Sequence, residues 1–204
     1  MIITYYGGQA TKLRTGDTII ATNPVSKDSK SKIKPSKFGA NVVLVSAHHP
    51  DYNGIDTVTY GDKEPFVISG PGEYEKEDIF FIGGLANTHI DGVEYINTIY
   101  SFVFDDIKIA FLGNMDSREI SADTREKLGD ADVVFVSLEN ISASDAYKLA
   151  SSFTPSLIIP MEYDNETLEK FLKEAGSDVK SIDKLTIKKK DLIGKDGVPV
   201  VLSY

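Results

Sequence analysis

The chain has 204 residues, of which 41% are hydrophobic and 26% are charged, and its formal net charge is -9. This composition excludes a disordered chain, and the length suits one domain with a sizeable core. The absence of cysteine excludes disulfide bonds, thiolate metal sites and cysteine nucleophiles.

The first half of the chain contains short apolar runs separated by turn residues, a pattern typical of β-strands. The expected strands are residues 2–6, 18–21, 42–45, 57–60, 66–69, 79–82, 98–104 and 107–112. The run 42–45 is apolar throughout, which indicates a strand buried on both faces. Asp105 and Asp106 separate the last two strands and predict a hairpin turn.

After Gly113, strands alternate with segments of helical periodicity. We expect helices at residues 121–128 and 144–151, and a third helix that Asn165 caps and Gly176 ends. The expected strands of this half are residues 133–136, 157–159 and 198–202. Two sheets packed face to face, with the helices outside, would bury all the strands in one core. Since no linker or repeat divides the chain, the sequence predicts an α/β protein with a single domain over residues 1–204.

Residue types that bind metals follow the buried run at 42–45. Residues 46–53 read Ser-Ala-His-His-Pro-Asp-Tyr-Asn, and closely spaced His and Asp after a short strand are typical of a metal site at the rim of a sheet. However, this segment supplies too few ligands to complete such a site.

Five strings, taken in order, resemble motifs of the metallo-β-lactamase superfamily, in particular its small branch of zinc-dependent hydrolases. They are Tyr5–Ala10, Thr22–Pro24, Gly70–Glu75, Leu112–Met115 and Ile159–Tyr163. The resemblance extends over nearly the whole chain and implies the fold of that superfamily, a four-layer αββα sandwich of two mixed sheets.

In that superfamily a His-x-His-x-Asp-His motif, a later His, a bridging Asp and a last His hold two metal ions. The resemblance implies a degenerate site, in which the positions of lost ligands are Ala47, Tyr52, Asn114 and Glu162. The remaining candidate metal ligands are His49, Asp51, His89 and Glu162. Asp51 is the candidate catalytic residue. Because a methyl group cannot coordinate a metal and an amide is a poorer ligand than a carboxylate, we expect no dinuclear zinc centre.

Two functions are compatible with this depleted ligand set. The first is a non-catalytic or weakly active protein that needs no cofactor and acts by binding a small molecule or a protein in the cleft. The alternative is a hydrolase of a phosphoester, ester or amide, in which one zinc, manganese or magnesium ion bound by the remaining ligands activates water. The number of replaced ligands favours the first function.

The segment from Lys27 to Lys37 holds five lysines and one acidic residue. It is interpreted as a solvated loop or, alternatively, as an electropositive lip that attracts an anionic substrate or partner. The net negative charge of the whole chain argues against nucleic-acid binding, because a protein needs a cationic surface to neutralise phosphates. With no apolar run near the roughly 20 residues of a membrane span and no signal-like N-terminal region, we expect a cytoplasmic protein.

Overall fold

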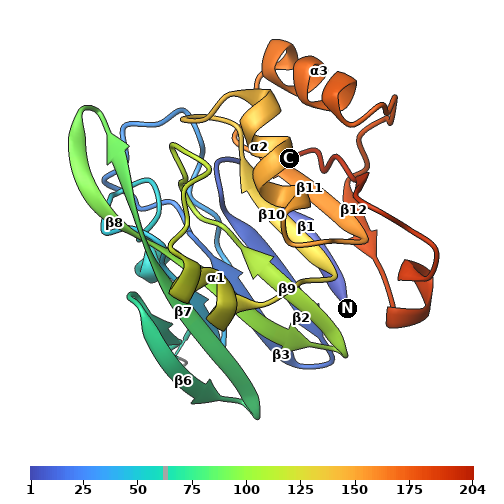
Figure 1. Ribbon diagram of the computed structural model, residues 1–204. Coiled ribbons are helices and arrows are strands. Elements are labelled where there is room, and N and C mark those ends of the chain that lie inside the picture. The colour runs from blue at the N-terminus through green and yellow to red at the C-terminus, as the bar shows by residue number, and fades with distance from the viewer. Residues whose placement is uncertain (62–63) are drawn as a thin grey trace.

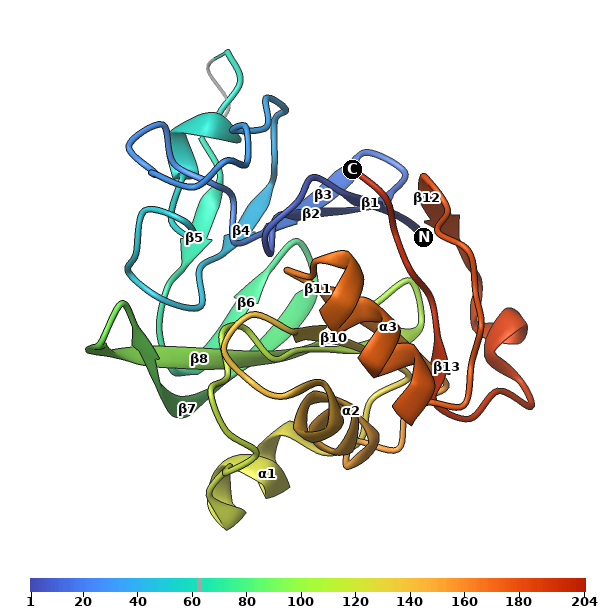
Figure 2. The same cartoon turned by 90° about the horizontal axis from the view of Figure 1, so that it is seen from above.

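The apolar runs of the sequence form two mixed sheets that pack face to face (Figure 1, Figure 2) in a computed structural model, which describes residues 1–61 and 64–204. The six strands of the first sheet, in spatial order, are β12 (Lys184–Thr186), β1 (Ile2–Tyr5), β2 (Thr11–Thr15), β3 (Thr18–Thr22), β4 (Val42–Leu44) and β5 (Phe66–Ile68). The seven strands of the second sheet are β13 (Val198–Pro199), β11 (Leu157–Met161), β10 (Val133–Ser137), β9 (Ile107–Phe111), β8 (Val93–Phe104), β7 (Ile79–Ile90) and β6 (Gly72–Lys76). The predicted sandwich of two mixed sheets is confirmed.

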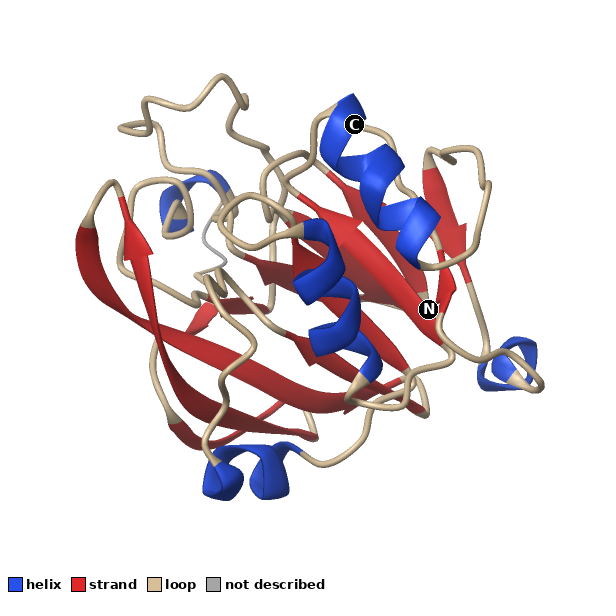
Figure 3. Ribbon diagram, turned by 45° about the horizontal axis from the view of Figure 1, so that its top comes forward, coloured by secondary structure: helices blue, strands red, loops and turns tan. Residues whose placement is uncertain are grey.

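The outer layers of the sandwich differ in kind (Figure 3). Three α-helices, α1 (Ala122–Leu128), α2 (Ala143–Ser151) and α3 (Asn165–Glu174), pack their apolar faces on the second sheet. The outer side of the first sheet is covered by the loop 24–41 and by a 3-10 turn, η1 (Ile55–Thr57). A second 3-10 turn, η2 (Lys189–Leu192), precedes β13. No helix in the described part of the chain is long and apolar enough to cross a bilayer.

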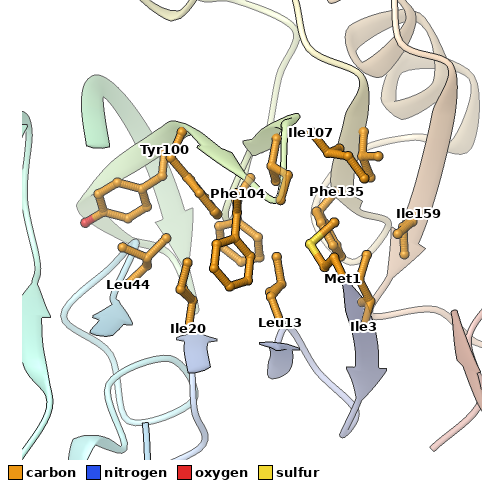
Figure 4. Packing of buried hydrophobic residues seen from close by; sticks show 14 of the residues in the cluster. Met1, Ile3, Leu13, Ile20, Leu44, Tyr100, Phe104, Ile107, Phe135 and Ile159 are labelled. Atoms are coloured by element: carbon orange, nitrogen blue, oxygen red, sulfur yellow. The ribbon is translucent and has the colours of Figure 1, made fainter. Parts of the chain in front are cut away.

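The main core lies between the two sheets (Figure 4). Leu13 of the first sheet and Phe135 of the second are both fully buried there, as the period-2 alternation of strands requires. The Tyr100 hydroxyl crosses between the sheets and donates to the Val45 carbonyl at 2.7 Å. Burial of this apolar surface is the main force that holds the sheets together.

Several predicted elements differ in type or extent. Residues 57–60 do not form the predicted strand, because Thr57 ends the 3-10 turn η1 and its hydroxyl donates to the Gly54 carbonyl at 2.6 Å. Helix α2 begins at Ala143, with Ser142 as its N-cap, and not at Ser144, and Asp164 rather than Asn165 caps α3. The predicted strand 198–202 shortens to β13.

Three strands are additional to those predicted: β2, β6 and β12. Strand β6 has no buried side chain. Strand β2 has two buried side chains, Leu13 and the polar Thr11, and its other three side chains are polar and partly or fully exposed. These strands therefore lack the apolar runs on which the sequence-based prediction depends. Conversely, the turn predicted at Asp105 and Asp106 is confirmed, and both residues have the positive φ of a tight hairpin turn.

Candidate functional site

Three of the metal-site positions that the resemblance implies, Asp51, Tyr52 and Glu162, lie at one rim of the sandwich, where strands of both sheets end. The turn between β1 and β2, the loop after β4 and the residues after β10 and β11 all contribute to a cleft of about 720 Å³. Its walls include aromatic, amide and carboxylate side chains. A cleft of this size accommodates a small-molecule ligand.

Glu162 follows β11 directly and is the centre of the site. Its Oε2 accepts hydrogen bonds from Gln9 Nε2 and Ser137 Oγ, both at 2.7 Å. Its Oε1 accepts one from the Tyr52 hydroxyl at 3.1 Å. All three donors are neutral and come from segments of both sheets, so this carboxylate joins the two halves of the rim.

Burial raises the pKa of the Glu162 carboxyl to about 7, although its three hydrogen bonds act in the opposite direction. The backbone of Glu162 is also unusual, because its φ of 50° lies in the left-handed region that non-glycine residues seldom occupy. Its backbone N–H donates to the Tyr5 hydroxyl at 3.0 Å and lies 3.2 Å from the Gly8 carbonyl oxygen. Such strain persists only where surrounding contacts hold the residue, as they do here.

The hydrogen bonds continue from Glu162 into the protein through what we term the polar network: Gln9, Asn23 and Ser46. Gln9 Oε1 accepts from Asn23 Nδ2 at 2.8 Å. Asn23 also donates to Ser46 Oγ at 2.7 Å and accepts from the Ser46 backbone N–H at 2.8 Å. All three residues are buried, so their polar groups depend on one another for hydrogen bonds.

Asn114, at the position of the bridging carboxylate, is fully buried. Its Oδ1 accepts from Asn140 Nδ2 at 3.0 Å, and its backbone N–H donates to Asn97 Oδ1 at 3.0 Å. Its Nδ2 has no hydrogen-bond partner among the described residues. A neutral amide at this place supplies no charge to balance a metal ion, and its N–H group repels a cation.

His49 and Asp51 lie beside each other, and Asp51 lines the cleft. His49 Nδ1 is 3.5 Å from Asp51 Oδ2, and the imidazole ring packs beside Tyr52 and Tyr95. Asp51 also accepts a hydrogen bond from Ser29 Oγ. The role of this pair as ligands or of Asp51 in catalysis stays a prediction.

His89 faces elsewhere. Its neighbour on β7, Ile90, packs against Ala47 and Tyr52, and successive side chains of a strand point to opposite faces. The His89 imidazole is 60% exposed, and its Nδ1 lies 2.8 Å from Asp116 Oδ2. The structure therefore does not place His89 with the other three candidate ligands.

The residues at this rim do not fit the metal centre of the resembling family. Catalytic zinc takes three protein ligands, but the described residues contain no group of three or more His, Asp or Glu side chains arranged to hold a metal ion. Ala47 contributes a methyl group that packs in an apolar cluster, and the Tyr52 hydroxyl is used in the hydrogen bond to Glu162.

Sequence reasoning missed the roles of Gln9 and Ser137, which hold Glu162. Gln9 is in the Gly7-Gly8-Gln9-Ala10 turn, and Ser137 ends β10. Their positions in the sequence could have indicated a place at the rim, since both residues lie near the ends of predicted strands. Neither position reveals the partner, because Gln9 and Glu162 are 153 residues apart.

The lysine-rich loop 27–37 borders the cleft on one side. Ser31, Lys32 and Ile33 line the cleft, and Lys32 and Lys34 also line a neighbouring hollow of about 710 Å³. Lys27 forms an exposed ion pair with Asp56 at 2.6 Å. The loop thus places lysines beside the site, but only one of them in the cleft itself.

Comparison with known proteins places the fold in a family. Residues 2–162 match the family model described as the beta-lactamase superfamily domain. No curated protein sequence matches the chain.

Solved structures of other proteins have the same fold. A candidate Zn-dependent hydrolase of the metallo-β-lactamase superfamily from Thermotoga maritima has 23% identity and a TM-score of 0.75, and the match covers 98% of this chain and 97% of that one. A metallo hydrolase from Ignicoccus hospitalis has 14% identity and a TM-score of 0.62, with 92% and 99% covered. An isothiocyanate hydrolase from Delia radicum gut bacteria has 10% identity and a TM-score of 0.62, with 92% and 100% covered.

Proposed function

We propose that this chain, which belongs to the metallo-β-lactamase superfamily, acts by binding a small molecule or a protein in the rim cleft and not by metal-dependent hydrolysis. One observation carries the proposal: Glu162, at the position of the last metal-binding His, has both carboxylate oxygens occupied by neutral hydrogen-bond donors.

The chemistry of the other positions supports the same conclusion. Hydrolysis by this family needs a metal that lowers the pKa of water and polarises the substrate. Ala47 and Asn114 supply neither imidazole nor carboxylate. The loss of ligands that contact the metal directly is more severe than the loss of supporting contacts, which alone reduce affinity about 10–100-fold.

The rim holds a cleft with a volume of about 720 Å³ and a mixture of aromatic and polar walls. A cleft of this size that lacks a complete set of metal ligands is suited to binding. The polar network and Glu162 hold the rim loops in place through hydrogen bonds, a role that metal–ligand bonds fill in metalloenzymes.

The test is a metal analysis joined to an activity assay. Protein purified without chelator, then dialysed with zinc or manganese, is measured for bound metal and for hydrolysis of a phosphodiester, an ester and an amide. We expect substoichiometric metal, and any residual hydrolysis unchanged in Asp51→Ala. Retention of two ions per chain, or metal-stimulated hydrolysis that Asp51→Ala abolishes, would establish the single-metal or dinuclear hydrolase instead.

A further inference from the structure

We propose that the hollow beside the rim cleft is a second ligand site, which binds a small carboxylate with an aromatic body. The hollow has a volume of about 710 Å³, which is typical of small-molecule sites. It shares some wall residues with the cleft, among them Lys32 and Tyr204, but neither Glu162 nor the polar network lines it. The inference is therefore independent of the function proposed for the cleft.

Most of the wall of the hollow is apolar or aromatic. The residues of this kind that line it are Tyr5, Tyr6, Ile33, Pro35 and Tyr204. The ring of Tyr6 stacks on Phe38 at 5.2 Å between centroids, and the ring of Tyr5 packs edge-on against Tyr204 at 5.3 Å. Because aromatic rings pack well against one another in stacked and edge-on arrangements, this wall suits an aromatic ligand.

The turn between β1 and β2 holds two of these walls in place. Gly7 in this turn has a φ of 90°, a conformation that side chains rarely allow. A Cβ atom at Gly7 would lie 2.8 Å from the ring of Tyr204 and 3.0 Å from Ile33 Cδ1. Tyr204 and Ile33 therefore pack directly against the backbone of the turn, and this packing fixes their positions.

The charged groups of the hollow favour an anion. Lys32 and Lys34 line it, and neither makes an ion pair with another described residue. The acidic side chain of the lining, Asp183, accepts a hydrogen bond from Ser203 Oγ at 3.1 Å. Two ammonium groups against one carboxylate leave a positive balance, although the chain as a whole has a net charge of -9. A positive balance of one charge matches a monoanion such as a carboxylate.

Ser36 provides an independent observation that points to a ligand. It lines the hollow, it is only 8% exposed, and its Oγ has no hydrogen-bond partner among the described residues. Buried hydroxyl groups normally have a partner, because an unpaired one is costly. A carboxylate oxygen in the hollow would supply an acceptor for this hydroxyl as well as for the neighbouring lysines.

The experiment compares four probes at constant ionic strength. Indole-3-acetate is the aromatic anion, indole-3-acetamide and tryptamine are its neutral and cationic analogues with the same ring, and acetate is an anion without the ring. Calorimetry measures affinity, and amide chemical shifts locate the binding. We expect saturable binding of indole-3-acetate alone, with shifts centred on residues 32–38 and 203–204 and not on the rim residues 137–140.

Three variants test the lining residues. Lys34→Gln removes a charge that lines the hollow and not the cleft, whereas Lys37→Gln removes an exposed charge of the same loop that lines neither. We expect Lys34→Gln to weaken binding of indole-3-acetate about tenfold, as loss of one charge-assisted hydrogen bond does, and Lys37→Gln to leave it unchanged. Ser36→Ala should weaken binding about fivefold without lowering the thermal midpoint, because the hydroxyl has no partner in the free protein.

The inference is wrong if indole-3-acetate binds no tighter than indole-3-acetamide, if tryptamine is preferred, or if the shifts centre on residues 137–140. Equal weakening by Lys34→Gln and Lys37→Gln would indicate nonspecific attraction to the loop and would also overturn it. If Ser36→Ala lowers the thermal midpoint and leaves binding unchanged, the hydroxyl serves the protein itself and the assigned site is incorrect. None of these results alters the expected metal content and hydrolysis, which test the function proposed for the cleft.

Discussion

The centre of the sandwich and its rim are stabilised in opposite ways. Between the sheets the interior is apolar, with side chains such as Leu13 and Phe135 fully buried. At the rim the interior is polar, and Asn23, Gln9 and Ser46 satisfy one another through hydrogen bonds. The apolar core therefore provides most of the stability, whereas the polar rim fixes the arrangement of the loops that form the site.

The two regions therefore tolerate change differently. An apolar core accepts substitutions that conserve volume, because its interactions are non-directional. A buried hydrogen-bond network depends on each member, because removal of one partner leaves another group unsatisfied. Substitutions in the two regions should therefore differ in their cost.

The largest effect is expected in the core. Phe135→Ala removes a fully buried ring between the sheets and should lower the free energy of unfolding by about 3–5 kcal/mol. Phe80→Ala is the matched control, since the Phe80 side chain is 51% exposed, and should cost less than half as much. Urea denaturation of both variants measures the difference, and similar losses would contradict the assignment of the core.

The second effect is a pH dependence that Glu162 introduces at the rim. Burial raises the pKa of this carboxyl from its ordinary value of 4.5 to about 7, so between these values the folded protein binds a proton that the unfolded chain releases. The free energy of unfolding should fall as pH rises from about 4.5 to about 7, by about 3 kcal/mol at most, and the contribution is constant above that range.

Urea denaturation across this pH range, in wild type and in Glu162→Gln, isolates the effect. The amide can accept from Gln9 and Ser137 through its oxygen and donate to the Tyr52 hydroxyl through its nitrogen, but it does not titrate. In Glu162→Gln, the free energy of unfolding should therefore no longer show the fall with rising pH that is due to Glu162. The control Glu126→Gln should keep this pH dependence. If the free energy of unfolding of Glu162→Gln depended on pH as it does in wild type, the pKa of the Glu162 carboxyl would not be raised by folding.

The smallest effect is expected within the polar network. Asn23→Ala removes hydrogen bonds to Gln9 and Ser46 and should cost about 1–3 kcal/mol. Asn87→Ala, at an exposed position of β7, is the control and should change stability by less than about 0.5 kcal/mol. Equal stabilities of the two variants in urea would show that the rim does not depend on this network.

Much of the fold was predictable because a short apolar run indicates a buried strand without any knowledge of distant contacts. The strand at 42–45 and the hairpin turn at Asp105 and Asp106 are examples. Prediction failed where burial is weak, as in the exposed edge strand β6, and at Thr57, which ends a 3-10 turn and whose hydroxyl donates to the Gly54 carbonyl. The candidate site was partly predictable, because the motif positions of Ala47, Asn114 and Glu162 indicated depletion of metal ligands before any geometry was known.

The sequence by itself determined the two-sheet architecture and the family resemblance, and it predicted the loss of metal ligands, because each depends on local pattern or on residue identity. Only the tertiary structure decided that His89 faces away from Ala47 and Tyr52, and that neutral donors surround Glu162. The physical reason is distance along the chain: Glu162 meets Gln9 across 153 residues, and only packing of the two sheets brings such side chains within hydrogen-bonding reach.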